Sequence, residues 1–404
     1  MSSPLANSIL DQEKLDVAQK TRANLFNWRG QFTPELIEYL LDTYSVQGDV
    51  VADPFAGSGT VLRESVRKGL RCQGLEINPG AYAMSRFYTL CNLEPQRRVE
   101  LFQTIEKRLT HTLRPLKGLP TFETGPAFRE QHRNLIEFAG NFFPLLESGL
   151  GKTIVLNMLF LSEGHKNYDL ETSLLTSYQY IRAAALALPH MDLPVSVGLA
   201  DARTLHLSKT RPSLIVTSPP YINVFNYHQN YRAILESVGW DMLRVAPSEF
   251  GSNRKNRGNR FKTVIQYCLD MDQALRSFWQ SLQEDGRLIL VIGKESNVRG
   301  LPFYNGQIVK EIAENMRGFE PVAQHERKFS NKFGEVIKED ILVFKKGADS
   351  PCASDVTRVA VKHLSAAFPA ANEDVRQDAL DAMLRCREVQ PSPLFNVKEA
   401  FPRV

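Results

Sequence analysis

The chain has few of the features that mark disulfide-rich, zinc-binding or membrane proteins. It contains five cysteines at wide spacings and no Cys-x-x-Cys pair, so we expect neither a disulfide framework nor a zinc site. No stretch approaches the roughly 20 apolar residues that span a bilayer. The N-terminus lacks the charged-then-apolar pattern of a secretory signal. These absences favour a protein of a reducing, cytoplasmic compartment.

Length and charge leave several classes open. A chain of 404 residues suggests one large domain with insertions, or two to three smaller domains. The formal net charge of +4 permits a polyanionic partner without demanding one. Local motifs therefore have to indicate the function.

A strand, a glycine turn and a helix follow one another near the N-terminus. Residues 49–53 form a short apolar run, residues 54–59 read Pro-Phe-Ala-Gly-Ser-Gly, and a helical pattern follows. A P-loop would need a Lys before Ser or Thr, which is absent. A dinucleotide fingerprint would need Gly or Ala where Leu62 stands. The remaining interpretation is a turn for S-adenosylmethionine, with Asp53 before it.

Three further strands are predicted to end in residues suited to ligand contact. The strand 71–76 ends in Glu76, where an acid can accept both ribose hydroxyls of a nucleotide, and the strand 195–199 is followed by Asp201. We expect Asp201 to contact adenine, although an Asp at this point is often a turn residue.

The apolar run 213–216 leads into Thr217-Ser218-Pro219-Pro220-Tyr221. Two prolines fix φ and remove two backbone donors, which leaves carbonyl acceptors in a stiff loop. With a hydroxyl on one side and an aromatic ring on the other, this loop is a candidate cradle for a planar group bearing an NH2. The alternative is a simple Pro-Pro turn at the end of a strand.

The rest of the chain divides into regions of different character. We predict a cofactor-binding part at 1–91 and a largely helical insertion at 92–190, a candidate for target recognition. The catalytic part spans 191–347, with a helix at 264–283, a strand at 286–293 and a closing antiparallel hairpin from 321–328 and 339–345. The tail, 348–404, has one predicted helix at 372–388 and no assigned role.

Two stretches after Tyr221 have a composition that suits nucleic acid. Residues 222–232 are rich in aromatic and amide side chains, among them Asn223 and Tyr227, which could stack on bases or bond to base edges. Residues 251–262 carry five cations and no acid, which suits phosphate contacts. These cations are Arg254, Lys255, Arg257, Arg260 and Lys262. A packed helix and a solvated loop are the respective alternatives.

With these residues in place, the chain resembles the S-adenosylmethionine-dependent amino-methyltransferases of DNA, and more narrowly the N4-cytosine type of restriction–modification systems. Residues 55–59 match the family's Phe-x-Gly-x-Gly turn, and Ser218–Tyr221 match its Ser-Pro-Pro-Tyr motif. Residues 26–36 stand where the family has a segment that folds over the methionine end of the cofactor. Local spacing alone favours core packing for Trp28 and Phe32 in that segment.

The resemblance implies a Rossmann-like α/β methyltransferase fold, with a mostly parallel sheet closed by an antiparallel hairpin. It implies duplex DNA as the partner and a cognate restriction endonuclease beside it. The implied catalytic residues are Ser218, Pro219, Pro220 and Tyr221. The implied cofactor-binding residues are Phe32, Asp53, Phe55, Gly57, Gly59, Thr60, Glu76, Asp201 and Thr217.

The expected chemistry is direct transfer of a methyl group to a base amine that Ser218 and the Pro219 carbonyl position, with Tyr221 stacking on a flipped base. C5-cytosine methylation needs a Cys nucleophile after Pro. The one Pro-Cys pair, Pro351-Cys352, lies in the tail, and we treat it as coincidence. Because the family often has Asp or Asn where Ser218 stands, adenine N6 remains an alternative target. RNA guanine N2 methylation and a non-catalytic scaffold are further alternatives.

Overall fold

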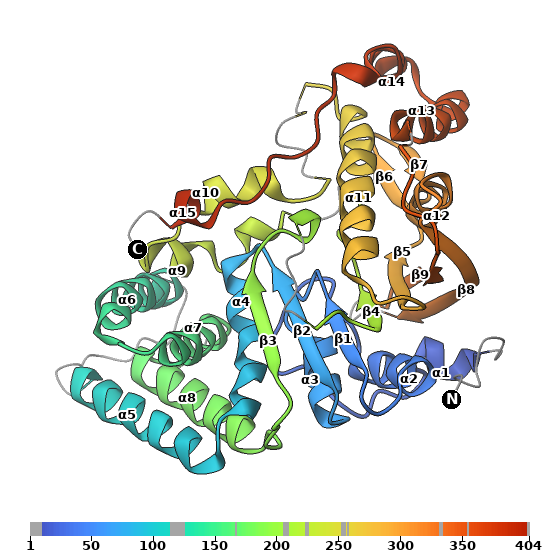
Figure 1. The fold of residues 1–404 in the computed structure, drawn as a ribbon. Coiled ribbons are helices and arrows are strands. Elements are labelled where there is room, and N and C mark those ends of the chain that lie inside the picture. The colour runs from blue at the N-terminus through green and yellow to red at the C-terminus, as the bar shows by residue number, and fades with distance from the viewer. Residues whose placement is uncertain are drawn as a thin grey trace.

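A seven-stranded sheet forms the centre of the computed structural model (Figure 1). The structure describes residues 10–113, 126–165, 168–204, 210–222, 226–251, 256, 258–330, 334–353 and 355–401, with side chains from 130 onward in the second range. The strands of this sheet are β1 (Val50–Asp53), β2 (Arg71–Glu76), β3 (Val195–Leu199), β4 (Leu214–Thr217), β5 (Arg287–Gly293), β8 (Phe319–Ser330) and β9 (Val336–Lys346).

The strand order places the ends of β1 and β4 at a point where the direction of winding reverses. The order is β3-β2-β1-β4-β5-β9-β8, with the first five strands parallel and β9 antiparallel to both neighbours. In open α/β sheets such a switch point opens a crevice at the carboxyl ends of the strands. The expected Rossmann-like methyltransferase fold with an antiparallel closing hairpin is confirmed.

Side chains on successive strand residues build two cores, one on each face of the sheet. In β5, Ile289 and Val291 belong to one core, while Leu288 and Leu290 belong to the other. This alternation follows from the two-residue period of a strand. The first core takes up α2 (Pro34–Tyr44), α3 (Thr60–Arg67) and α4 (Pro79–Arg86), and the second takes up α11 (Lys262–Ser281), α12 (Asn305–Asn315) and α13 (Val356–Ala367).

Four long helices occupy the region predicted as a helical insertion, and no strand is assigned among its described residues. They are α5 (Pro95–Leu113), α6 (Pro126–Phe142), α7 (Gly149–Glu163) and α8 (Leu170–Leu186), which extend from α4 at the lower left of Figure 1. The helix α7 was not predicted. Its side chains are buried on most sides, so its sequence lacks the apolar stripe that marks a surface helix.

The remaining elements, apart from α14 in the tail, are short. They are α1 (Gln12–Asp16), α9 (Arg232–Ser237), α10 (Met242–Val245), α15 (Val397–Ala400), the hairpin β6 (Ser296–Val298) and β7 (Leu301–Phe303), and the 3-10 turns η1 (Phe87–Asn92), η3 (Phe143–Leu145), η4 (Ala202–Thr204), η5 (Tyr227–Gln229), η6 (Ala246–Ser248), η7 (Phe368–Ala370) and η8 (Cys386–Glu388).

The prediction of a single helix in the tail was wrong. Besides α14 (Glu373–Leu384), the tail contains α13, whose residues Val356, Val359, Ala360 and Leu364 are buried against the sheet domain. Their helical spacing was present in the sequence but was not recognised. After η8 the chain returns along the molecule to α10, as the red segment in Figure 1 shows.

Candidate active site

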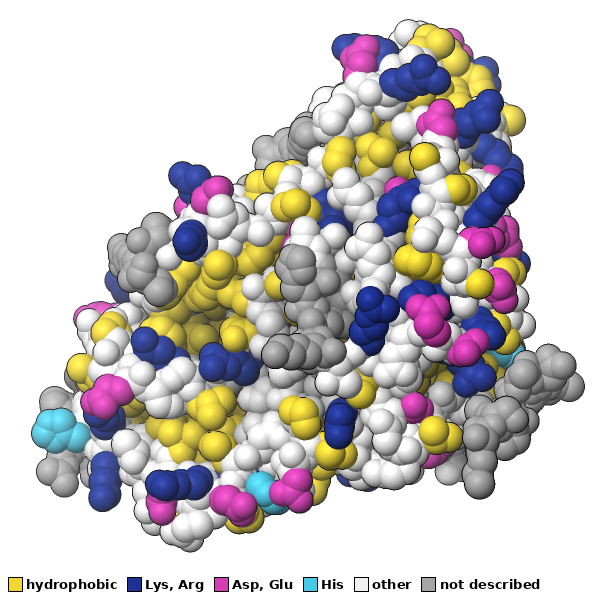
Figure 2. Space-filling model, in the orientation of Figure 1, with side chains coloured by type: hydrophobic (Ala, Val, Ile, Leu, Met, Phe, Trp, Pro, Cys, Tyr) yellow, Lys and Arg dark blue, Asp and Glu magenta, His cyan; other side chains and the backbone are white. Residues whose placement is uncertain are grey.

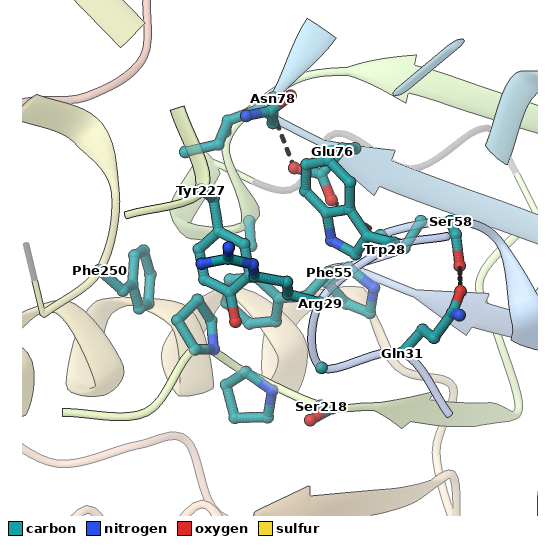
Figure 3. A pocket seen from close by; sticks show the side chains of 18 of the residues that line it. Trp28, Arg29, Gln31, Phe55, Ser58, Glu76, Asn78, Ser218, Tyr227 and Phe250 are labelled. Carbon is teal, nitrogen blue, oxygen red and sulfur yellow. Dashed lines mark hydrogen bonds between the residues drawn. The ribbon is translucent and has the colours of Figure 1, made fainter. Parts of the chain in front are cut away.

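A pocket lies at the carboxyl ends of β1, β2 and β4 (Figure 3). It encloses about 890 Å³ of empty space, a volume that includes the open mouth. Most of the residues predicted for the cofactor and the methyl acceptor line it. These are Phe32, Phe55, Gly57, Thr60, Glu76, Asp201, Ser218, Pro219, Pro220 and Tyr221.

The glycine turn brings backbone close to this pocket. Gly57 and Gly59 have φ of 52° and 86°, in the left-handed region that favours glycine. A Cβ on Gly59 would lie 2.8 Å from the Ser85 Cα and 2.9 Å from the Tyr88 ring. Glycine at this position therefore lets the turn pack directly on the end of α4 and on η1, and α3 begins at the next residue, Thr60.

Glu76 sits at the end of β2 with both carboxylate oxygens held by backbone. The Gly57 N–H donates to Oε2 over 2.9 Å and the Asn78 N–H donates to Oε1 over 2.8 Å. Burial raises the pKa of Glu76 to about 7, against the lowering effect of these hydrogen bonds. Each oxygen keeps a lone pair for a ligand hydroxyl.

Asp53, Gly59 and Thr217 lie behind the pocket wall rather than among its lining residues. The Thr217 hydroxyl donates to Asp53 Oδ1 over 2.6 Å, and the Phe55 N–H donates to the same oxygen over 3.2 Å. Burial raises the pKa of Asp53 to about 7. These bonds tie the end of β1 to the end of β4, so the glycine turn and the Pro-Pro loop are held together.

The Pro-Pro loop presents Ser218 toward the pocket and is tied to the closing hairpin through Tyr221. The Ser218 Oγ lies 3.3 Å from the Tyr221 hydroxyl, which donates to Glu339 Oε1 over 3.1 Å. Figure 3 shows Ser218 on the opposite side of the pocket from Glu76 and Asn78, with Trp28 and Phe55 between them.

The N-terminal segment lies over the glycine turn. The Ser58 hydroxyl donates to Gln31 Oε1 over 2.8 Å, and a Cβ on Gly57 would lie 3.4 Å from the Trp28 ring. Trp28 stacks on Tyr227, with ring centroids 6.0 Å apart and planes at 15°. Trp28 belongs to the first hydrophobic core and Phe32 packs against it, as local spacing favoured, and both residues also line the pocket.

Asp201 touches the pocket, but its carboxylate is fully engaged elsewhere. Oδ1 accepts from the Arg203 backbone N–H and Nε, at 3.0 and 2.9 Å, while Oδ2 accepts from Arg203 Nη2 at 2.6 Å and the Phe395 N–H at 3.0 Å. A carboxylate has about four acceptor positions, so these bonds use them all.

Of the residues predicted to contact nucleic acid, the structure describes Tyr227, Arg260 and Lys262. Tyr227 lines the pocket beside Trp28. Lys262, at the start of α11, pairs with Asp381 of α14 at 2.8 Å, and Arg260 lies two residues before it. Asn223, Arg254, Lys255 and Arg257 lie outside the described residues.

Several lining residues were not predicted from the sequence. Asn78, Glu249 and Phe250 line the pocket, and Arg29 is the cation among the lining residues of the described chain. Asn78 was assigned only as the start of a helix, and the residues 249–250 follow no strand and carry no motif. The position of Asn78, two residues after Glu76, was the one available signal.

The pocket fits S-adenosylmethionine in its donor set and shape. Glu76 offers carboxylate oxygens that ribose hydroxyls could donate to, and the aromatic and apolar lining suits a purine. Asn78 Nδ2 is a buried donor with no hydrogen-bond partner in the described structure, so a ligand acceptor would satisfy it. Arg29 supplies a charge opposite to that of the cofactor carboxylate.

Two searches of the described residues had negative results. No group of three or more His, Cys, Asp or Glu side chains there is arranged to hold a metal ion. None of the helices in this part of the chain combines the length and apolar character that a bilayer span requires.

Comparisons with known proteins find one family model, one curated relative and several solved structures. Residues 7–87 match the model of a family described as DNA methylase, N6_N4_Mtase. The Type II methyltransferase M.MjaII of Methanocaldococcus jannaschii is 40% identical over 52 residues, which are 13% of this chain and 10% of that protein. The match thus spans about a tenth of the relative's length.

Solved methyltransferase structures give weaker likenesses. TrmN from Thermus thermophilus is 14% identical with a TM-score of 0.33, and the match covers 79% of this chain and 50% of that one. The rRNA methyltransferase aviRa from Streptomyces viridochromogenes is 13% identical with a TM-score of 0.35, and the match covers 82% and 94%.

The family match, the strand order and the pocket agree on the cofactor, which is S-adenosylmethionine. The match includes the N-terminal segment, the glycine turn and Glu76. Residues 7–87 thus match the model of the DNA methylase family, within a chain that has the Rossmann-like fold of S-adenosylmethionine-dependent methyltransferases.

Proposed function

We propose that this protein transfers a methyl group from S-adenosylmethionine to the exocyclic N4 amine of cytosine in duplex DNA. The observation that carries this proposal is the shared pocket: Ser218, Pro219 and Pro220 line the same cavity as Gly57 and Glu76. A methyl acceptor held by the Pro-Pro loop would therefore lie beside a cofactor held by the ends of β1 and β2.

Different lining residues would contact different parts of the cofactor. Glu76 would hold the ribose hydroxyls, and Gly57 and Thr60 would lie against the methionine part, covered by Phe32. Arg29 would pair with its carboxylate. Phe55 and Phe250, whose rings meet edge to face at 5.1 Å, would offer apolar surface to adenine.

We assign supporting roles to the predicted cofactor residues that lack a free contact. Asp53, Gly59 and Thr217 hold the turn from behind. Asp201 has no acceptor position left for the adenine amine, so it would shape the adenine end of the pocket through Arg203.

The Pro-Pro loop supplies acceptors for an amine. An exocyclic base amine is a poor nucleophile because its lone pair is delocalised into the ring. Hydrogen bonds from the amine to Ser218 Oγ and the Pro219 carbonyl would localise that lone pair and aim it. S-adenosylmethionine, when bound, supplies an electrophilic methyl group on a sulfonium centre. No covalent bond to the protein is needed.

The acceptor base would reach the pocket by flipping out of the duplex, because its amine is otherwise inaccessible inside the stack. Tyr221 lines the pocket and would contact the flipped base through its ring, as the sequence predicted, while its hydroxyl stays bonded to Glu339. Trp28 and Tyr227, stacked on each other at the pocket, add further aromatic surface for a base.

Contacts to the DNA backbone are proposed for the basic stretch 251–262. On the face drawn in Figure 2, cationic and anionic side chains are interspersed, and hydrophobic side chains gather in a hollow left of centre. The phosphate contacts would come from Arg254, Lys255, Arg257, Arg260 and Lys262 of this stretch, together with Asn223 after the catalytic motif. A cognate endonuclease that shares the recognition site is part of this proposal.

The alternative targets differ in the base and the polymer. Adenine N6 offers the same kind of amine to Ser218, and the matched family's label includes both N6 and N4. Guanine N2 in RNA requires a different polymer, and a scaffold requires no transfer.

The proposal is tested by incubating the full chain with S-adenosylmethionine that carries a labelled methyl group and with duplex DNA or tRNA, followed by nucleoside analysis. We expect N4-methyldeoxycytidine from DNA and no labelled nucleoside from tRNA. N6-methyldeoxyadenosine would overturn the assignment of the base. Label in tRNA alone would overturn the polymer, and no label in either would overturn the activity.

A further inference from the structure

A series of side-chain contacts, here called the Ser218–Glu339 relay chain, leads from the proposed methyl-acceptor site into the closing hairpin. Ser218 Oγ lies 3.3 Å from the Tyr221 hydroxyl, and that hydroxyl donates to Glu339 Oε1 over 3.1 Å. Glu339 Oε2 in turn lies 3.4 Å from Nε of Arg327, a side chain that is only 2% exposed. The chain crosses from the loop after β4 to β9 and β8, which the sequence separates by more than a hundred residues.

The sheet register creates the space for this chain. Glu339 of β9 pairs with Gly293 of β5 on one side and with Arg327 of β8 on the other. The Tyr221 ring occupies the place of a side chain at Gly293, since a Cβ there would lie 2.6 Å from the ring. Tyr221 can reach Glu339 because the residue between them has no side chain.

The hydrogen-bond donors fix the direction of the chain. An ionised carboxylate has no proton, so Tyr221 must donate its single hydroxyl proton to Glu339. The Ser218 hydroxyl must then donate to the Tyr221 oxygen, because Tyr221 has no second proton. Ser218 is left with its lone pairs facing the pocket, so it can accept from an amine N–H and cannot donate to a ring carbonyl.

We propose that Glu339 is a positioning residue that sets this direction and takes up, through Tyr221 and Ser218, the proton that the amine loses. This inference rests on the proposed function. When the amine nitrogen forms its bond to the methyl carbon, the electron pair of the broken carbon–sulfur bond leaves with sulfur, and nitrogen holds one proton too many. That proton passes to Ser218 while the Ser218 proton passes to Tyr221 and the Tyr221 proton passes to Glu339.

The step leaves a neutral methylated base and a neutral carboxylic acid. Glu339 can later return its proton to water, because its side chain is 14% exposed. Burial raises the pKa of Glu339, while Arg327 and the Tyr221 hydroxyl lower it. Among the described residues, the charged or titratable groups that face it are these two, with Asp16 of α1 beyond Arg327. A carboxyl of raised pKa is a better proton acceptor than an exposed one.

The test compares Glu339→Gln and Tyr221→Phe with Glu326→Gln on the same hairpin. Glu326 pairs with Lys294 and lies outside the chain of hydrogen bonds. The substrate is a duplex that carries the site found by sequencing DNA methylated by the wild-type protein. We expect kcat to fall about tenfold or more in Glu339→Gln and in Tyr221→Phe, and to stay unchanged in Glu326→Gln. Cofactor binding, measured by calorimetry, should be equal in all four proteins.

The pH profile separates this role from a purely structural one. In the wild type, kcat should fall as the pH drops through the pKa of Glu339, because a protonated Glu339 reverses the hydrogen bonds and turns the Ser218 proton into the pocket. The Glu339→Gln variant should lack this acid limb. The double variant should be no slower than the slower single variant, since both changes interrupt one chain.

A measurement without cofactor or DNA completes the test. The infrared band of the protonated Glu339 carboxyl, identified by its loss in Glu339→Gln, should titrate at a higher pKa in Tyr221→Phe than in the wild type, because that variant removes a hydrogen bond to the ionised form.

An unshifted band would overturn the proposed chain, and so would a wild-type acid limb that persists in Glu339→Gln. If the wild type methylates no DNA at all, the proposed function itself fails, and this inference fails with it.

Discussion

At the scale of single residues, the site buries carboxyl groups that its own backbone holds in place. Asp53 and Glu76 stand at the ends of neighbouring strands, and burial raises the pKa of each to about 7. A carboxyl whose pKa is raised in the folded state stabilises the fold at low pH, and that contribution is lost as the pH rises through the folded pKa. The cofactor site is thus built at a cost in stability at neutral pH.

Replacing Asp53 with Asn should therefore stabilise the free protein in alkaline solution. Asn Oδ1 can still accept from Phe55 N–H and the Thr217 hydroxyl, but it carries no charge. We expect the Tm of Asp53→Asn to exceed that of the wild type by an amount that grows as the pH rises from the ordinary Asp pKa of 3.8 to the folded pKa of about 7 and then levels off. The exposed Asp349→Asn serves as control in thermal denaturation at each pH. A constant difference across this range would contradict the prediction.

Ser218→Ala should separate cofactor binding from transfer. Removing the hydroxyl takes away an acceptor for the amine, so kcat should fall about 100-fold, a loss typical for one precisely placed polar group. The affinity for S-adenosylmethionine, measured by calorimetry, should not change. Ser365→Ala, exposed on α13, is the matched control. Full activity in Ser218→Ala would refute the assignment of the acceptor site.

At the scale of elements, strand ends and the turn after β1 make the pocket. Asp53, Glu76 and Ser218 lie on three separate segments of sequence, and the strand order β2-β1-β4 brings them to one edge. The glycine turn then allows α3 to start against that edge. Its tight packing predicts which glycines of the fold tolerate a side chain.

Gly59→Ala should destabilise the protein more than Gly69→Ala. Both residues have positive φ, but only Gly59 would place its Cβ against the Ser85 backbone and the Tyr88 ring, while Gly69 has nothing within 4 Å. The difference between the two losses of unfolding free energy measures the steric overlap at Gly59, which we expect to cost about 1–3 kcal/mol. Urea denaturation with an unchanged slope measures it. Equal losses in the two variants would show that the turn can relax.

At the scale of the whole molecule, the C-terminal segment closes the fold around the cofactor site. Arg203 donates through Nη1 to the Ser392 carbonyl over 2.6 Å and to Asp270 over 2.9 Å, while the Phe395 N–H reaches Asp201. All of these charged groups are buried. Residues at the end of the chain therefore complete the surroundings of an acid near its middle.

Deleting residues 390–404 should weaken cofactor binding as well as stability. The deletion removes the Ser392 and Pro393 carbonyls from Arg203, and the Ser392 N–H and hydroxyl from Asp270, at a cost of about 1–3 kcal/mol for each buried group left unsatisfied. We expect a lower Tm and an affinity for S-adenosylmethionine reduced about tenfold, because Asp201 at the pocket loses the bond from the Phe395 N–H. A chain that lacks only 402–404 is the control, and an unchanged affinity would contradict the prediction.

The affinity for DNA and its dependence on salt are also properties of the whole molecule. Replacing Arg254, Lys255 and Arg257 with Ala should weaken DNA binding and reduce the slope of log K against log salt by about 0.9 for each lost phosphate contact. The control removes Arg358, Lys362 and Arg387, three exposed cations of the tail. Fluorescence anisotropy across a salt series measures both. Equal slopes in wild type and loop variant would assign the loop to solvent.

Much of the fold was predictable because its signals are local. The apolar runs that form β1, β2, β3 and β5, and the glycine turn between β1 and α3, follow from residue types and spacing. The helix α7 and the short β6–β7 hairpin were not predicted. A helix buried on most sides has no polar face, and strands of three residues carry too little periodicity.

The sequence alone indicated the kind of site: an acid at the ends of three strands, a glycine turn and a Ser-Pro-Pro-Tyr loop, whose expected chemistry follows from residue type. Only the tertiary structure decided which of these groups keep free contacts. It engaged Asp201 with Arg203 and Phe395, placed Trp28 in the pocket, and joined Tyr221 to Glu339 through the gap at Gly293. These pairings join distant segments, and strand register and packing, which no local pattern encodes, set their distances.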